Sequence, residues 1–279
     1  MIIKTLIKIA IICFTLLLSA CDLLMNDNID NICTNSPEIC NDINKISHCR
    51  FKRTEVIRAR YYDKINPSNI HKTNLLTELN EYESCLERTL FLQPVRNKER
   101  QNLRVENYLR TQQLIKEHLA LSKGTKDPIL AYYLWTRYQD KHARSVFFNE
   151  AMKDNVKNPQ LLFKLATTYS KDNPQKSLDL FYKALRLTKS LEQTTPLTFV
   201  MIMTIFYQKK SFEEAYIWAL VAKELDENDE YPINLELILQ KGDPYGEQLI
   251  FNEEKLNDKA DQYYDQLDDG KFKAKAPNL

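Results

Sequence analysis

Apolar residues recur every three or four positions along the first half of the chain, which is the spacing of an amphipathic helix. In residues 74–92 the apolar positions are 75, 76, 79, 82, 86 and 90, and a longer, highly charged periodic stretch runs from 98 to 124. The sequence Ser36-Pro37-Glu38 supplies an N-cap, a first-turn proline and a first-turn acid for an earlier helix. The pattern therefore predicts three helices between residues 37 and 123, the last one capped by Gly124.

The second half of the chain repeats one pattern three times. Apolar helical runs open at prolines 128, 159 and 196, at intervals of 31 and 37 residues, and each is followed by a short polar turn and a second helix. A tyrosine ends each first helix, and a small alanine in each second helix allows close packing; the pairs are Tyr138 with Ala151, Tyr169 with Ala184, and Tyr207 with Ala222. We therefore expect an all-α solenoid over residues 127–270, closed by a polar capping helix. Residues 271–279 are expected to form a disordered tail.

These helix pairs resemble tetratricopeptide (TPR) and Sel1-like repeats, whose period is about 34 residues. The resemblance implies a short TPR-like α-solenoid with an exposed concave surface. The match is degenerate and lacks the full repeat signature, and an irregular helical bundle would show the same amphipathicity.

The N-terminus carries a short apolar run that ends at a cysteine. Lys4 and Lys8 precede or interrupt apolar residues that continue to Leu18, which predicts a secretory signal peptide over residues 1–20. The run is too short for a comfortable membrane span of about 20 residues. Its end, Leu18-Ser19-Ala20-Cys21, resembles the lipobox of bacterial lipoproteins. The resemblance implies that Cys21 is acylated and that the chain is cleaved after Ala20.

A lipid-anchored N-terminus implies a body held at a bilayer, since more than one acyl chain gives stable anchoring. Asp22 resembles the signal that keeps enteric-type lipoproteins in the inner membrane, so we expect the periplasmic face of that membrane. The inner leaflet of the outer membrane is the alternative. Residues 21–36 are rich in Asn and Asp and show no helical stripe, so they are expected to be a tether. A helical N-terminal domain over residues 37–126 would follow.

Four cysteines remain after the signal, which allows three disulfide connectivities in an exported chain. A turn at residues 63–69 would fold two helices antiparallel and place Cys49 opposite Cys85. Cys33 and Cys40 would then close a local loop. The spacings lack the paired C-x₂-C of structural zinc sites, which disfavours a metal site.

Charge and motifs exclude several function classes. Losing Lys4 and Lys8 changes the formal net charge from +1 to about −1, which gives no reason to expect nucleic-acid binding. The chain lacks G-x-S-x-G, H-E-x-x-H, P-loop and dinucleotide-binding motifs, so we expect neither a catalytic site nor a cofactor. Asp140, His142 and Ser145 lie close in sequence but belong to a solvated turn. The basic stretch Arg50–Arg60 is expected to be a solvated face balanced by acids of the next helix, with an anionic partner as the alternative.

A repeat fold without a catalytic constellation predicts a non-enzymatic scaffold or adaptor that binds another envelope protein. Trp135, Tyr132 and Tyr216 fall on repeat helices and form the candidate partner surface, although core packing is the default for such residues. The alternatives are an envelope-glycan enzyme with an unrecognised pair of carboxylates, and a small-ligand binder with an enclosed apolar pocket.

The stretches ICTNSPEIC, HCRFKRTEVIRARY, YESCLE, PILAYYLWTRYQDKHA and ADQYYDQLDDGKF resemble an uncharacterised family of Gram-negative lipoproteins. The resemblance covers most of the mature chain. It implies fold and location only, because the family carries a domain of unknown function.

Overall fold

The computed structural model describes residues 28–46, 48–92, 99–226, 229–242 and 252–279. Throughout these residues the secondary structure is helical and contains no strand, which confirms the all-α fold class. The chain divides into two compact units, Met1–Tyr133 (unit 1) and Leu134–Leu279 (unit 2). The boundary lies inside helix α7 (Pro128–Tyr138) and not at the predicted residues 126 and 127. Within unit 1 the hydroxyl of Tyr133 accepts a hydrogen bond of 2.9 Å from the side-chain amide of Asn80.

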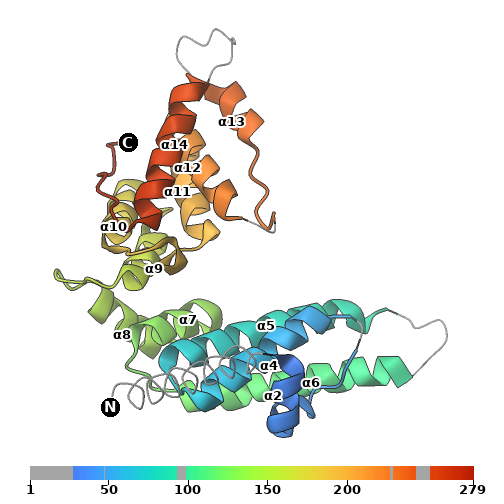
Figure 1. Cartoon of the computed structure of the whole chain (residues 1–279). Coiled ribbons are helices and arrows are strands. Elements are labelled where there is room, and N and C mark those ends of the chain that lie inside the picture. Colours follow the sequence, from blue (N-terminus) through green and yellow to red (C-terminus); the bar gives the residue numbers. More distant parts are fainter. Residues whose placement is uncertain (1–27, 47, 93–98, 227–228, 243–251) are drawn as a thin grey trace, which may run out of the picture. The chain divides into compact units, whose positions relative to one another are not determined.

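Three long helices form the body of unit 1. These are α4 (Arg50–Ile65), α5 (Asn69–Leu90) and α6 (Glu99–Ser122), and α5 packs against both of the others (Figure 1). The predicted apolar stripe of α5 faces this interior, where Leu75, Leu76, Leu79, Tyr82 and Leu86 are all buried. Ser68 caps the start of α5 by accepting a hydrogen bond from the backbone N–H of His71.

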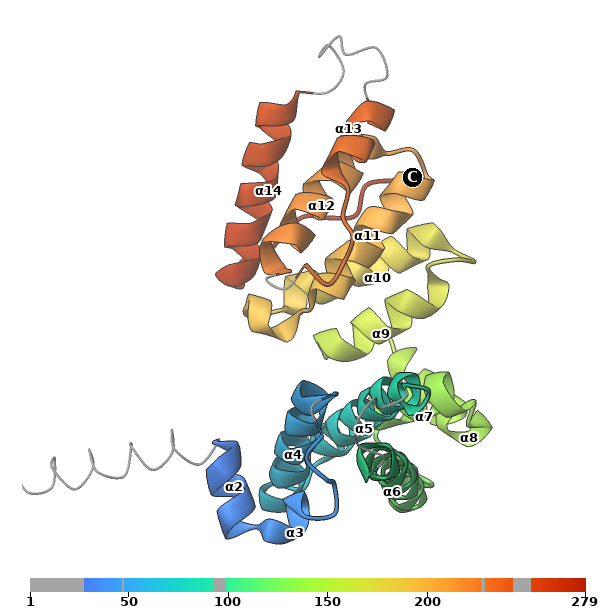
Figure 2. The same cartoon turned by 90° about the vertical axis from the view of Figure 1, so that its right-hand side faces the viewer.

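Two short helices precede α4 and differ from the prediction. Residues 29–35 of the expected tether form helix α2 (Ile29–Asn35), which Asn28 caps and which buries Ile32. The helix expected to run from Pro37 into α4 is interrupted, because α3 (Pro37–Cys40) ends after four residues and α4 begins only at Arg50. Figure 2 shows α2 and α3 beside α4.

The second half of the chain contains the predicted helix pairs, and the first pair begins in unit 1 because α7 crosses the unit boundary. They are α7 with α8 (Lys141–Ala151), α9 (Pro159–Tyr169) with α10 (Pro174–Leu187), and α11 (Pro196–Gln208) with α12 (Phe212–Leu225). Each first helix begins at a predicted proline, whose fixed φ and missing N–H suit the first helical position. The three predicted alanines are buried, as close packing requires. A 3₁₀ turn (Leu191–Gln193), α13 (Leu235–Gly242) and α14 (Glu253–Asp268) complete the unit, so the packing is solenoid-like.

The core of unit 2 is built around Trp218, which is fully buried. Its indole N–H donates to the hydroxyl of Tyr182 at 2.9 Å, and its ring stacks on Phe199 with centroids 5.7 Å apart. A buried indole or phenol needs a hydrogen-bond partner, and here each satisfies the other. Burial raises the pKa of Tyr182 well above its usual range, so this hydroxyl stays protonated.

The C-terminal segment 271–279 lacks regular secondary structure but is packed, so the prediction of a disordered tail is wrong. Phe272 inserts into the core, with its ring centroid 6.0 Å from that of Trp218. Arg186 donates to the backbone carbonyl of Ala274 at 2.9 Å, which ties the segment to α10. The turn into this segment needs Gly270, because its φ is +65° and a Cβ there would lie 2.5 Å from the backbone oxygen of Lys189.

None of the helices in the described ranges is both long and apolar enough to cross a membrane. The predicted signal peptide and the lipobox, residues 1–21, together with Asp22, lie outside the described residues.

Candidate partner-binding surface

A hollow of about 720 Å³ opens beside Trp135 in unit 2. Helices α7 and α8, the C-terminal end of α9 and the turn between α9 and α10 form its walls. Aromatic, thioether, cationic, acidic, amide and hydroxyl side chains all reach it: Trp135, Arg144, Ser145, Phe148, Asn149, Met152, Thr168, Tyr169, Asp172 and Asn173. We name it the Trp135 hollow.

Aromatic packing fixes the position of Trp135. Its ring stacks on the buried Phe147 with centroids 5.9 Å apart and an interplanar angle of 27°. Phe148 lies on the solvent side, 5.2 Å from Trp135 and tilted by 57°. Trp135 is half-buried, so it contributes both to the core and to the wall of the hollow. The two readings of this residue, core packing and partner surface, are therefore compatible.

A cation lies over this aromatic pair. The guanidinium carbon of Arg144 is 5.0 Å from the ring centroid of Phe148 and 5.6 Å from that of Trp135. Such contacts hold an arginine plane against an aromatic face. Arg144 is exposed and forms no ion pair within the described part of the chain, so its N–H donors can reach an external acceptor. The rim therefore presents a positive charge beside an apolar wall.

Met152 completes the rim and is 56% exposed. Arg144, Phe148 and Met152 follow each other at steps of four, which places them on one row of α8 and its C-cap. Thioethers adapt to irregular partners, and exposed methionines are common at binding surfaces. Sequence reasoning selected Trp135 but missed these three residues, although their spacing could have indicated them.

Asp140 and Ser145, which lie close to His142 in the sequence, form local helix contacts. The carboxylate of Asp140 accepts a hydrogen bond of 2.9 Å from the backbone N–H of Ala143 and so caps α8. Ser145 donates to the backbone carbonyl of Lys141. Only Asp140 belongs to the turn, because α8 already begins at Lys141.

The other two predicted surface residues do not join Trp135. Tyr132 is half-buried in unit 1. Tyr216 is only 3% exposed, and its hydroxyl donates to a carboxylate oxygen of Glu253 at 3.1 Å. Burial, together with this carboxylate, raises the pKa of Tyr216 to about 12. The candidate surface is therefore centred on Trp135 alone.

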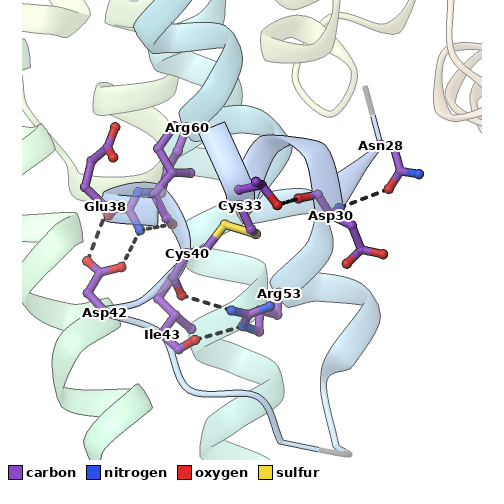
Figure 3. Close-up of a disulfide and its surroundings, with 11 residues drawn as sticks. Asn28, Asp30, Cys33, Glu38, Cys40, Asp42, Ile43, Arg53 and Arg60 are labelled. Carbon is purple, nitrogen blue, oxygen red and sulfur yellow. Dashed lines mark hydrogen bonds and ion pairs between the residues drawn. A yellow bond between two sulfur atoms is a disulfide. The ribbon is translucent and has the colours of Figure 1, made fainter. Parts of the chain in front are cut away.

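Both preferred disulfides are present. Cys33 pairs with Cys40 and Cys49 pairs with Cys85, with Cα atoms 5.5 Å and 5.9 Å apart. The second bridge joins α5 to the residue that caps α4, as the predicted antiparallel pair requires. The first closes the turn between α2 and α3 (Figure 3).

The basic residues Arg50–Arg60 are only partly a solvated face. Lys52 pairs with Glu81 of the next helix, as predicted. Arg53, however, is 7% exposed and donates to the backbone carbonyls of Ile43 and Cys40, both at 2.9 Å (Figure 3). Burial lowers the pKa of Arg53.

Asp42 lies at the centre of a second internal cluster. It accepts hydrogen bonds from Arg60 at 2.7 Å and from Arg110 of α6 at 2.9 Å. Burial alone would raise the pKa of Asp42, but the bonds and charges of the two arginines outweigh it and lower that pKa. The cluster fastens the chain around α3 to α4 and α6, so these arginines hold unit 1 together.

In the described ranges, no group of three or more His, Cys, Asp or Glu side chains is arranged to hold a metal ion. No curated protein and no solved structure matches the chain. A family model described as "Protein of unknown function (DUF2989)" matches residues 18–220, which is more than half of the 279 residues. The match includes both disulfides and every residue that lines the Trp135 hollow. The chain therefore belongs to the DUF2989 family of proteins of unknown function.

Proposed function

We propose that this protein is a lipid-anchored envelope adaptor that binds another protein through the Trp135 hollow. The observation that carries the proposal is the exposed arginine stacked over Trp135 and Phe148 at the mouth of a hollow of about 720 Å³. Aromatic residues, methionine and arginine are the types enriched at protein interfaces. The helix pairs that display them are interpreted as degenerate TPR-like repeats.

The anchor is proposed from the sequence Leu18-Ser19-Ala20-Cys21. Acylation of Cys21 after removal of the signal would hold the folded units at a bilayer. Asp22 supports the periplasmic face of the inner membrane, with the outer membrane as the alternative. Two disulfides in unit 1 agree with an oxidising compartment.

The chemistry of the hollow defines the partner segment. An apolar side chain would pack against Phe148 and Met152, and a carboxylate beside it would pair with Arg144. Arginine recognises carboxylates through paired N–H donors, and aromatic stacking holds its plane ready for them. We therefore expect a partner segment that carries an acidic residue next to a large apolar one.

Photo-crosslinking in living cells tests this proposal. A photoreactive phenylalanine analogue replaces Met152, which is exposed and lines the hollow. The expected result is one specific cross-linked envelope protein, whose captured peptide contains an acidic residue beside an apolar one. Arg144→Ala should abolish that product. Lys141→Ala is the matched control, because it removes a positive charge from an exposed position of the same helix outside the hollow.

Equal cross-linking in the Arg144 and Lys141 variants would show that the hollow does not select its partner. The absence of any specific product in otherwise stable, correctly located protein would argue against an adaptor role.

A further inference from the structure

A second groove, of about 750 Å³, lies between α12 and α14 in unit 2. The two helices pack side by side in both views (Figures 1 and 2). Each contributes a row of residues at steps of four: Tyr216, Leu220 and Glu224 from α12, and Asn257, Asp261 and Asp265 from α14. Eight residues of helix rise about 12 Å, so each row matches two helical turns or about four extended residues of a ligand.

The groove has an apolar base. Val221 and Ala260, both buried, line it from the two helices, and Leu220 is partly exposed beside them. Its volume falls within the range of about 300–1,000 Å³ that is usual for ligand sites. An apolar side chain can therefore be buried here.

All the charged side chains that line the groove are acidic. Glu224, Asp261 and Asp265 are exposed carboxylates, and no Lys, Arg or His side chain is among the lining residues. None of the three carboxylates forms an ion pair with a residue in the described ranges. The side-chain oxygen of Asn257 is shielded from solvent and also lacks a hydrogen-bond donor among the described residues. The three carboxylates and the side-chain oxygen of Asn257 are therefore available to accept hydrogen bonds from a ligand that carries N–H or O–H donors.

We propose that the α12–α14 groove binds a cationic segment of a partner protein, with an apolar side chain on the base and Lys or Arg side chains on the three carboxylates. Charge complementarity selects this occupant, because an acidic or neutral segment would leave the carboxylates uncompensated. The site differs from the Trp135 hollow, which is lined by both Arg144 and Asp172, and the inference does not depend on that hollow.

Fluorescence anisotropy with two labelled peptides tests the proposal on the full mature chain. One peptide of twelve residues carries lysines flanking a leucine in an alanine background, and the matched peptide has glutamate in place of lysine. The groove variant is Asp261→Asn with Asp265→Asn. The control variant is Asp258→Asn with Asp268→Asn, which removes the same charge from exposed positions of α14 that do not line the groove.

The lysine peptide should bind the wild type and the control variant with similar affinity, and the glutamate peptide should not bind. Losing two exposed charge pairs should weaken binding to the groove variant about tenfold. Leu220→Ala should weaken it further without changing the charge. Equal weakening in both Asn variants would overturn the proposal, because it would show that the peptide responds to the overall negative charge of the protein and not to the groove. Failure of the lysine peptide to bind the wild type would also overturn it.

Discussion

Replacing Phe272 by alanine should destabilise unit 2 strongly, although this residue lies only seven positions from the C-terminus. Its ring is 3% exposed. The ring centroid lies 5.3 Å from that of Tyr263, 5.9 Å from that of Tyr182 and 6.0 Å from that of Trp218. The substitution would open a cavity in the middle of this aromatic cluster.

The magnitude follows from the buried area. An aromatic side chain buries roughly 150–250 Å², and about 25 cal/mol per Å² of apolar area gives about 4–6 kcal/mol. Alanine retains the Cβ, so the measured range of about 3–5 kcal/mol for such truncations is the better guide. Phe272→Ala should therefore lower the free energy of unfolding of unit 2 by about 4 kcal/mol.

Urea unfolding followed by tryptophan fluorescence measures this change. Both tryptophans of the chain, Trp135 and Trp218, lie in unit 2, and the ring of Trp218 contacts that of Phe272, so the signal reports the unfolding of this unit. Lys273→Ala is the neighbouring control, because the side chain is exposed and its loss should change stability by less than about 0.5 kcal/mol. If Phe272→Ala and Lys273→Ala had equally small effects, the C-terminal segment would not be part of the core.

Two further predictions concern unit 1 and use far-UV circular dichroism. Replacing Cys49 and Cys85 by serine should lower the free energy of unfolding of unit 1 by about 4 kcal/mol, and replacing Cys33 and Cys40 should lower it by only about 2.5 kcal/mol. The difference arises because the unfolded chain gains more entropy when the longer loop is opened, and equal losses would contradict this account. The lowered pKa of Asp42 means that its stabilising contribution is present above the unfolded pKa of about 4 and is lost as pH falls through the folded value. Below about pH 4 the free energy of unfolding should therefore fall more steeply with decreasing pH in the wild type than in Asp42→Asn. Parallel curves of unfolding free energy against pH would refute the role of the arginine cluster.

Local signals in the sequence predicted most of the helices and the disulfide pairing. Proline at a first helical position acts within one turn, so residues 128, 159 and 196 marked helix starts correctly. The pairing of Cys49 with Cys85 followed from their similar distances to the turn at residues 63–69.

Features that depend on contacts distant in sequence were missed. Helix α2 has few apolar residues of its own, and Ile32 is buried only through packing near Ile39 and Ile57. The segment after Gly270 has no periodicity, and Phe272 finds its place only once α10, α12 and α14 have assembled. At the candidate site, Trp135 was recognisable as an aromatic on a repeat helix. Arg144 lies over Trp135 only because α8 begins at Lys141 and places Arg144 one turn before Phe148, a tertiary contact that the sequence pattern does not reveal.

The proposed envelope role depends on the lipid anchor. Metabolic labelling with radioactive palmitate tests this anchor most directly. The account predicts that the wild-type chain takes up the label and fractionates with membranes. Cys21→Ser should take up none and leave the membrane fraction. Equal labelling of the two chains, or equal membrane retention of Cys21→Ser, would contradict it.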